Sequence, residues 1–223
     1  MRNHYYNKSS DNQKFINAFG VYFEMYVEEL LNNCLAENNY ERITECGRKR
    51  ADWKLQLGDY EFLVEQKSSL SLLGIKQTQP DIKKFKEHII KCWGKAVIQL
   101  NETEKDLKLS SPIKIILLYE DYYKSECLDL LFEYDDYVDY YDGKYWLVTI
   151  NEFEMLIKLY KDNPDLFFTV IKEKDESELN KSNKGREPLR FLRSHGIYEN
   201  SYLEEFHIYD QFTKVQNLTK KHQ

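Results

Sequence analysis

The chain has 223 residues, of which 42% are hydrophobic and 31% are charged, with only eight glycines and four prolines. This composition excludes collagen-like, linker-like and wholly disordered classes, and it predicts a folded protein with a substantial core. Residues 1–14 are polar, and no apolar run approaches the roughly 18 residues that a membrane span needs, so we expect a cytoplasmic location.

The charge is unevenly distributed along the chain. The net charge of −6 argues at first against a nucleic-acid partner, but residues 120–142 alone contain nine acidic residues and one lysine. The rest of the chain is therefore slightly positive, and local charge matters more than the sum. The acidic, tyrosine-rich segment 119–145 is either a solvated region far from any site or a docking surface for a basic or aromatic-rich protein.

The cysteines are widely spaced and form no C-x-x-C pair. This spacing indicates free thiols in a reducing compartment and argues against a zinc site. The four residues are Cys34, Cys46, Cys92 and Cys127.

Hydrophobic periodicity predicts the elements of the first half of the chain. Apolar residues at three- and four-residue spacing predict a helix over 14–32, followed by a strand over 41–46. Alternating patterns over 51–57 and 60–67, separated by Gly58-Asp59, predict a hairpin. A second long helix is expected over 80–100, with Pro80 at a position where a helix start tolerates it.

The second half is predicted to continue the alternation of strands and helices. We expect a buried strand over 113–119, a helix over 125–132, a strand over 145–150 and a helix over 152–160 that stops before Pro164. This order implies an α/β fold in which helices cover both faces of a mixed central sheet. Residues 1–173 would form the main domain, the charged stretch 174–188 a linker, and residues 189–223 a small C-terminal extension.

The hairpin register predicts where the chemistry lies. If Gly58-Asp59 is a two-residue turn, residue 57 pairs with residue 60, and one face of the hairpin is wholly apolar. The other face places Asp52 opposite Glu65, with Lys67 two residues further along. Opposed carboxylates repel unless something neutralises them, and a divalent cation such as Mg²⁺ or Mn²⁺ prefers such ligands. The alternative is an ordinary solvent-facing charge network.

Several motifs together resemble the PD-(D/E)XK nuclease superfamily. Asp52, twelve intervening residues and then Glu65-Gln66-Lys67 resemble its signature, although Ala51 stands where proline is common. The pattern that begins at Gly20 and includes Glu24 is similar to the first helix of Mrr-type endonucleases and archaeal Holliday-junction resolvases. The resemblance covers residues 14–119 and implies a restriction-endonuclease-like core of helix, three strands, helix and strand.

The resemblance implies a role for each matching residue. Asp52, Glu65 and Lys67 would be catalytic, and Glu24 and Gln66 would join Asp52 and Glu65 at the metal; the alternative for Glu24 is a solvated helix residue. On the second helix Lys95 and Gln99 would face the substrate phosphate, unless they are only its polar side. Basic residues flank this site and would contact DNA through phosphates. They are Lys49, Arg50, Lys54, Lys83, Lys84, Lys91 and Lys95.

Three functional hypotheses follow. The first is a Mg²⁺-dependent deoxyribonuclease that acts in restriction or anti-phage defence, as a homodimer or with a partner subunit. The second is a nucleic-acid-binding module that has the fold without catalysis. The third is a protein-interaction subunit of a nuclease complex, motivated by the acidic segment.

Overall fold

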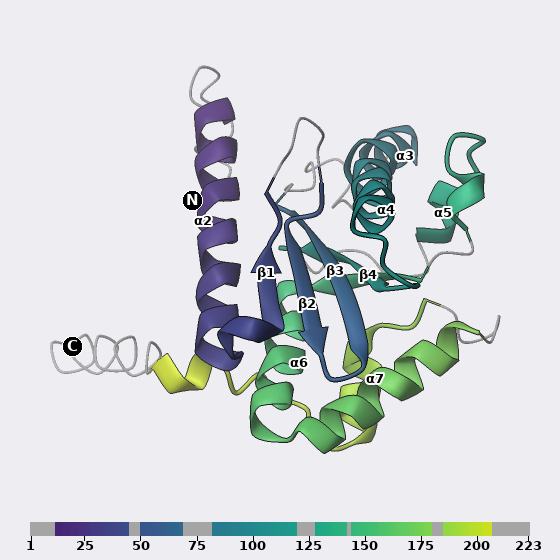
Figure 1. The fold of residues 1–223 in the computed structure, drawn as a ribbon. Helices are drawn as coiled ribbons and strands as arrows, with labels where there is room; N and C mark the ends of the chain where they lie inside the picture. The colour runs from purple at the N-terminus through teal and green to yellow at the C-terminus, as the bar shows by residue number, and fades with distance from the viewer. Residues whose placement is uncertain are drawn as a thin grey trace, which may run out of the picture.

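A computed structural model of the chain describes residues 12–44, 50–68, 82–119, 128–141, 144–179 and 185–206. Five strands form one open mixed sheet in the order β1-β2-β3-β4-β5 (Figure 1). The strands are β1 (Tyr40–Arg42), β2 (Trp53–Leu57), β3 (Tyr60–Lys67), β4 (Ile113–Leu118) and β5 (Tyr145–Thr149). The first three strands are antiparallel, whereas β4 and β5 run parallel to β3. The predicted α/β class and mixed sheet are confirmed.

The hairpin has the predicted register. Leu57 pairs with Tyr60, Leu55 with Phe62 and Trp53 with Val64. Gly58 opens the turn with φ of +57°, a left-handed conformation that glycine adopts without steric cost. All the β2 and β3 residues that alternation assigned to the core are buried except Tyr60, which is partly buried and packs against that core. The hydrophobic pattern thus fixed the register, because a one-residue slip would have turned Trp53 and Leu55 to the opposite face.

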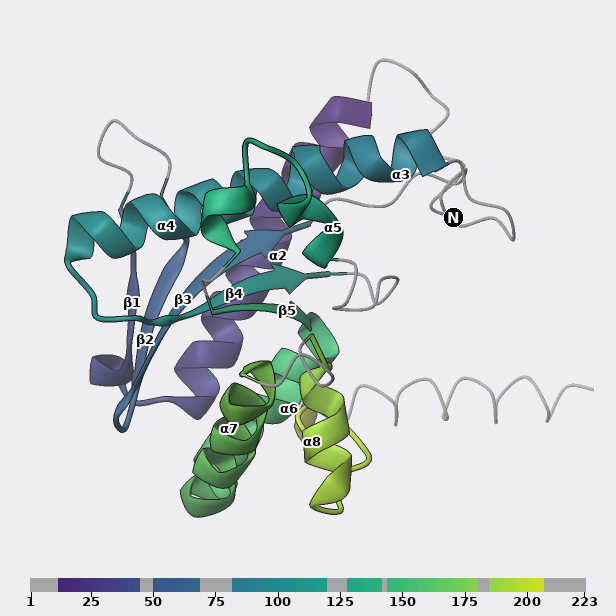
Figure 2. The ribbon, with the colours of Figure 1, turned by 90° about the vertical axis from the view of Figure 1, so that its right-hand side faces the viewer.

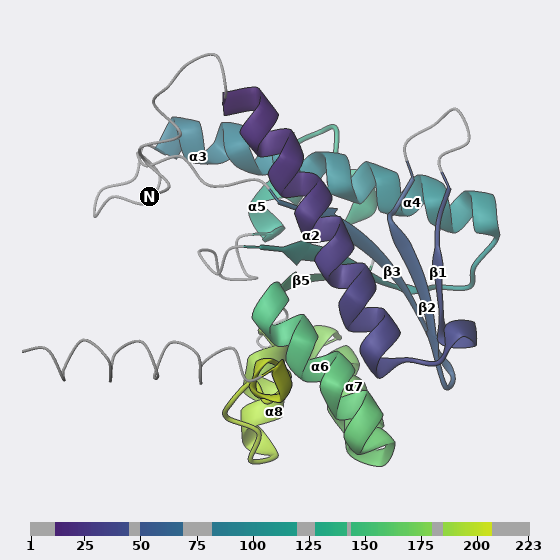
Figure 3. The same cartoon turned by 90° about the vertical axis from the view of Figure 1, so that its left-hand side faces the viewer.

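Helices cover both faces of the sheet. On one face lie α2 (Asn12–Cys34) and α6 (Ile150–Asp162), whose apolar residues share one core with Trp53, Leu55 and Phe62 (Figure 3). On the other face lie α3 (Ile82–Ile89), α4 (Lys95–Leu107) and α5 (Asp129–Phe132), with a second core around Leu63 and Trp93 (Figure 2). Short 3-10 turns, η1 (Glu37–Asn39) and η5 (Val138–Tyr140), connect these elements.

The long helix expected over 80–100 contains a wide turn. Between α3 and α4 the backbone forms a π-helical segment, η3 (Ile90–Gly94), and Pro80 lies outside the described residues. Gly94 occurs here because a Cβ at this position would lie 2.5 Å from the Tyr137 ring, so only glycine admits that ring. Cys34 and Cys92 are buried and are not in a disulfide, while Cys46 and Cys127 are outside the described residues.

The C-terminal part differs from the prediction. Helix α7 (Pro164–Glu178), which was not predicted from the sequence, begins at Pro164 with Asn163 as its N-cap and includes the first five residues of the expected linker. Lys174 is buried there, with its Nζ over the Trp146 ring and in an ion pair with Glu178. Helix α8 (Pro188–Ser194) and the 3-10 turn η6 (Leu203–Phe206) follow. Leu192 and Tyr202 belong to the α2–α6 core, so this segment packs on the main body.

The other predicted elements agree with the structure within a few residues. The expected strand over 41–46 is represented by β1, and residues 45–46 are outside the described part of the chain. The expected helix over 125–132 is represented by α5, with residues 125–127 also outside. Among the described helices, none is long and apolar enough to cross a membrane.

Candidate functional site

The candidate site lies at the carboxyl end of β3, next to the parallel strand β4. Glu65 pairs with Ile116 and Lys67 with Leu118 along these strands. Residues two apart on a strand share a face, so Glu65 and Lys67 both point to the side that α4 covers, with the buried Leu63. In open α/β sheets, ligands commonly bind beyond the carboxyl ends of the strands.

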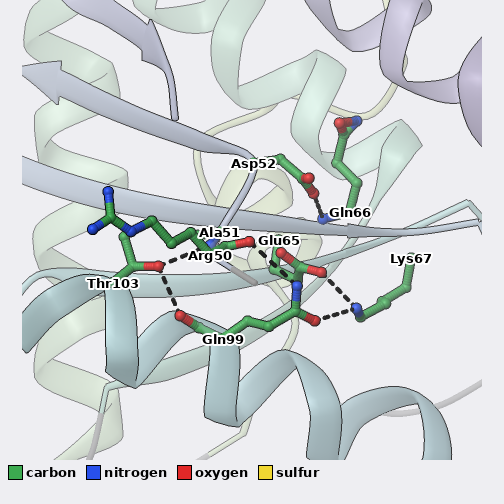
Figure 4. Close-up of polar contacts among 8 residues, drawn as sticks. All are labelled: Arg50, Ala51, Asp52, Glu65, Gln66, Lys67, Gln99 and Thr103. Atoms are coloured by element: carbon green, nitrogen blue, oxygen red, sulfur yellow. Dashed lines mark hydrogen bonds and ion pairs between the residues drawn. The ribbon is translucent and has the colours of Figure 1, made fainter. Parts of the chain in front are cut away.

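Lys67 contacts both Glu65 and Gln99 in this region (Figure 4). The Nζ of Lys67 lies 2.5 Å from Oε1 of Glu65 and donates to Oε1 of Gln99 at 3.0 Å. Only 3% of Glu65 is exposed. A buried carboxylate is costly unless it is paired, and Lys67 supplies the paired charge.

Asp52 approaches the same segment from the residue before β2. Its N–H donates to the carbonyl of Val64 at 2.9 Å, although Val64 is the strand partner of Trp53, and the pairing of β2 with β3 ends there. The predicted pairing of Asp52 directly opposite Glu65 is therefore not formed. Its Oδ2 accepts from the backbone N–H of Gln66 at 2.6 Å, between Glu65 and Lys67 (Figure 4). Burial raises the pKa of Asp52 to about 6, although the Gln66 N–H and the Lys67 charge oppose this increase.

Helix α4 is tied to the chain just before Asp52 through two polar side chains. Thr103 accepts from the N–H of Ala51 at 2.8 Å and donates to the Gln99 carbonyl at 2.7 Å. Gln99 donates to the carbonyl of Arg50 at 3.2 Å. Thr103 was not predicted from the sequence as a site residue, although its i, i+4 spacing from Gln99 indicates a shared helix face.

The Gln66 side chain lies on the opposite face of the sheet from Glu65 (Figure 4). Its Oε1 accepts from Nε1 of Trp53 at 3.0 Å, inside the α2 side of the molecule. The amide therefore anchors the core face of β3, while the Gln66 backbone contacts Asp52.

Glu24 lies on the surface of α2 and contacts Arg42 of β1. Its carboxylate lies 2.9 Å from Arg42, which also approaches Glu28 at 3.9 Å. Glu24 still lies within electrostatic range of the site, since its negative charge contributes to the raised pKa of Asp52. The structure thus places Glu24 near Asp52, but in an ion pair with Arg42.

The predicted basic residues fall into two groups. Lys83, Lys84, Lys91 and Lys95 are exposed along α3, η3 and the start of α4. Arg50 and Lys54 are partly buried and paired, with Asp106 at 2.8 Å and Glu61 at 3.5 Å respectively. Lys49 lies outside the described residues.

The donor set suits a hard divalent cation held by few protein ligands. Within the described ranges, no group of three or more His, Cys, Asp or Glu residues is placed to hold a metal. Asp52 and Glu65 provide two carboxylates next to the same peptide unit, and the desolvation that raises the pKa of Asp52 would be relieved by a cation. Mg²⁺ commonly binds through one or two carboxylates together with waters and a substrate phosphate.

Comparison of the chain with protein-family models, with curated proteins and with solved structures finds no match.

Proposed function

We propose that this protein is a metal-dependent nuclease that hydrolyses DNA phosphodiester bonds on a restriction-endonuclease-like core. The observation that carries the proposal is the contact of Lys67 with both Glu65, on the same face of β3, and Gln99 of α4. Asp52 joins them through the Gln66 backbone. These residues come from strand β3, the residue before β2 and helix α4, yet they converge at the carboxyl end of β3.

The order of elements supports the same proposal. Helix α2, the antiparallel strands β1 to β3, helix α4 and strand β4 follow one another along the chain. This is the order that the sequence resemblance implies for the catalytic core. Because one fold can serve many functions, the proposal rests on the chemistry of Asp52, Glu65 and Lys67.

Asp52 and Glu65 are the residues that would hold Mg²⁺ or Mn²⁺. When bound, such an ion polarises a phosphoryl oxygen and supplies a nucleophilic water at neutral pH. In the metal-free protein the pKa of Asp52 is raised to about 6, and a bound cation would lower it by favouring the ionised carboxylate. The activity should therefore decline at a pH below about 6, where Asp52 becomes protonated and the metal is released.

Lys67 and Gln99 have different roles in this proposal. The Lys67 ammonium would stabilise the negative charge that develops on the phosphate, which is electrostatic catalysis by a fixed charge. Gln99 accepts from that ammonium and donates to the Arg50 carbonyl, so it holds Lys67 relative to the chain that leads into Asp52. Gln99 is thus a positioning residue.

The exposed lysines of α3 and α4 provide a surface for the DNA backbone. Contacts of Lys with phosphates give affinity without reading the base sequence. Lys91 and Lys95 are exposed on the same continuous helical run that carries Gln99. A strand bound along them would therefore lead toward the site.

Cleavage of a DNA panel tests the proposal. The purified full chain is incubated with linear, circular, single-stranded and branched DNA in Mg²⁺, in Mn²⁺ and in EDTA. We expect metal-dependent cleavage of at least one form, its loss in Glu65→Gln, and its retention in Glu176→Gln, an exposed α7 residue far from the site in sequence.

Absence of cleavage of every form by the wild-type protein with its natural partner would reject the enzymatic proposal. A salt-dependent gel shift would then separate a DNA-binding module from a protein-interaction subunit.

A further inference from the structure

A cavity of about 270 Å³ lies on the α2 side of the sheet, across from α4. Helix α2 and helix α6 lie side by side here (Figure 3). Aromatic side chains of α2 and of the residue after β4 form its walls. These are Phe19, Tyr22, Phe23, Tyr26 and Tyr119, and the start of α6 adds Ile150 and Glu154.

The aromatic rings of this cavity are arranged at right angles and remain accessible. The centroids of Phe19 and Tyr119 lie 4.6 Å apart with an angle of 85°, and those of Phe23 and Tyr119 lie 5.7 Å apart at 81°. Tyr22 is 69% exposed and Tyr119 is 43% exposed. A group of accessible rings around a hollow is a typical surface for stacking a flat ligand.

The lining also contains a buried polar group. Glu154 is 4% exposed, and its carboxylate accepts from the Tyr26 hydroxyl at 2.5 Å and from the Asn200 amide. Each carboxylate oxygen can accept more than one hydrogen bond, so Glu154 can still receive an N–H from a ligand. A purely apolar occupant would cover this carboxylate without bonding to it, which costs free energy.

The cavity is next to the candidate site along the strand ends. The N–H of Tyr119 donates to the carbonyl of Lys67 at 3.3 Å, and Leu118 is the strand partner of Lys67. Alternation turns the Lys67 side chain to the α4 face and Tyr119 to the α2 face. A nucleic-acid strand that passes over the ends of β3 and β4 would therefore contact the Lys67 ammonium and then the aromatic side chains of the cavity.

We propose that the cavity binds one unpaired nucleobase of a nucleic-acid strand whose phosphate lies at Lys67. The base would stack on the aromatic wall, and an N–H on its edge would donate to Glu154. The volume of about 270 Å³ is slightly below the roughly 300–1000 Å³ of cavities that hold drug-sized ligands, which is consistent with a smaller occupant. This inference rests on the proposed function, and it makes single-stranded DNA, or DNA with an unpaired segment, the substrate class.

Base pairing explains why the substrate would be unpaired. A base within a duplex is stacked and paired, so it reaches a pocket only after it leaves the helix, at an energetic cost. A single strand does not require that step. The phosphate contacts of the exposed lysines would be common to both forms.

The test compares the binding of two labelled DNAs in EDTA, which prevents metal-dependent cleavage. A fluorescein-labelled single strand and a blunt duplex of equal length are titrated by fluorescence polarisation. Tyr22→Ala and Tyr119→Ala should each weaken single-strand binding roughly 5- to 100-fold, the range of base–aromatic stacking, and leave duplex binding unchanged. Val21→Ala and Met25→Ala are controls, because these residues are 55% and 57% exposed on α2 but do not line the cavity.

A second measurement locates the base directly. A single strand with 5-iodouracil at one position is photocrosslinked to the wild-type protein, and the modified peptide is identified by mass spectrometry. Crosslinks at Tyr22 or Tyr119 support the proposal even if one tyrosine variant does not fold.

The outcomes distinguish this inference from the proposed function. If the wild-type protein binds the single strand and both tyrosine variants bind it equally well, the cavity proposal is overturned and the nuclease proposal stands. If the variants lose single-strand and duplex binding to the same extent, the base-specific role is also overturned. A wild-type protein that binds neither DNA contradicts both.

Discussion

The ammonium of Lys67 lies 2.5 Å from Oε1 of Glu65, two residues earlier on the same strand. The Glu65 side chain is 4% exposed and the Lys67 side chain 17% exposed, so both charges are largely removed from water. In such a pair the attraction offsets a large desolvation cost, and removal of one partner leaves the other charge buried without compensation.

Single and double substitutions of this pair should not be additive. Lys67→Met should lower the free energy of unfolding by about 3 kcal/mol, because it leaves the Glu65 carboxylate buried and uncompensated. The double variant Glu65→Gln/Lys67→Met should recover most of that loss, since neither charge remains. Urea unfolding of the four proteins completes the double-mutant cycle. Additive effects would show that the two groups are independently solvated.

Ionisation of Asp52 should lower the free energy of unfolding. Its folded-state pKa is raised from 3.8 to about 6, so the folded protein binds a proton more tightly than the unfolded chain does. Its stabilising contribution is complete below about pH 4 and is lost as the pH rises through about 6. Asp52→Asn should therefore be more stable than the wild type at pH 7, by at most about 3 kcal/mol at ~1.4 kcal/mol per pKa unit.

The Asp52→Asn variant removes the ionisable group but keeps the backbone contact, because the asparagine side chain can still accept a hydrogen bond from the Gln66 N–H. The stability difference between the two metal-free proteins should disappear near pH 4 in thermal unfolding measured with a chelator. A difference that does not vary between pH 4 and pH 7 would indicate an Asp52 pKa close to its ordinary value.

The hairpin and most of the elements could be predicted from the sequence because strand alternation leaves little freedom. Trp53, Leu55 and Phe62 can all be buried in only one register, and Glu65 and Lys67 then share the other face. The contact of Lys67 with Gln99 could not be derived in this way. The contact depends on which side of α4 Gln99 faces. The π-helical segment Ile90–Gly94 rotates the residues that follow it, and it has no sequence signal as clear as a proline.

Helix α7 was missed for a different reason. The charged sequence after Ile171 has few apolar residues, which favoured a linker, although the contact of the Lys174 ammonium with the Trp146 ring needs no hydrophobic repeat. Ion pairs at i, i+4 spacing, such as Lys172 with Glu176 and Lys174 with Glu178, support the helix instead.

Thr103 should be required for the connection between α4 and Asp52. Thr103→Val removes the acceptor of the Ala51 N–H and should cost about 1–3 kcal/mol, because that donor is buried. Thr103→Ser keeps the hydroxyl and should cost much less, mainly because it removes a methyl group. Chemical unfolding of both variants provides the comparison. Equal losses of stability in the two variants would show that Thr103 contributes through packing and not through its hydroxyl.

The exposed lysines of α3 to α4 should act on DNA through phosphates. Lys91→Gln/Lys95→Gln should weaken binding to all sequences and reduce the slope of log K against log salt by about 0.7 to 0.9 for each phosphate that the variant no longer binds. Lys161→Gln/Lys172→Gln, which neutralises two exposed lysines on α6 and α7, is the matched control. An unchanged salt slope in the α3–α4 variant would place the DNA elsewhere.

The contrast between Lys67→Ala and Asp52→Ala tests the proposed active site most directly. Calorimetric titration of Mn²⁺ with DNA present is combined with the cleavage rate at a temperature where each variant is folded. Lys67→Ala should keep most of its metal affinity and lose about 10²- to 10³-fold in rate, as expected when a charge-stabilising group is removed. Asp52→Ala should lose both. Cleavage by Lys67→Ala at the wild-type rate would contradict the assignment of this site.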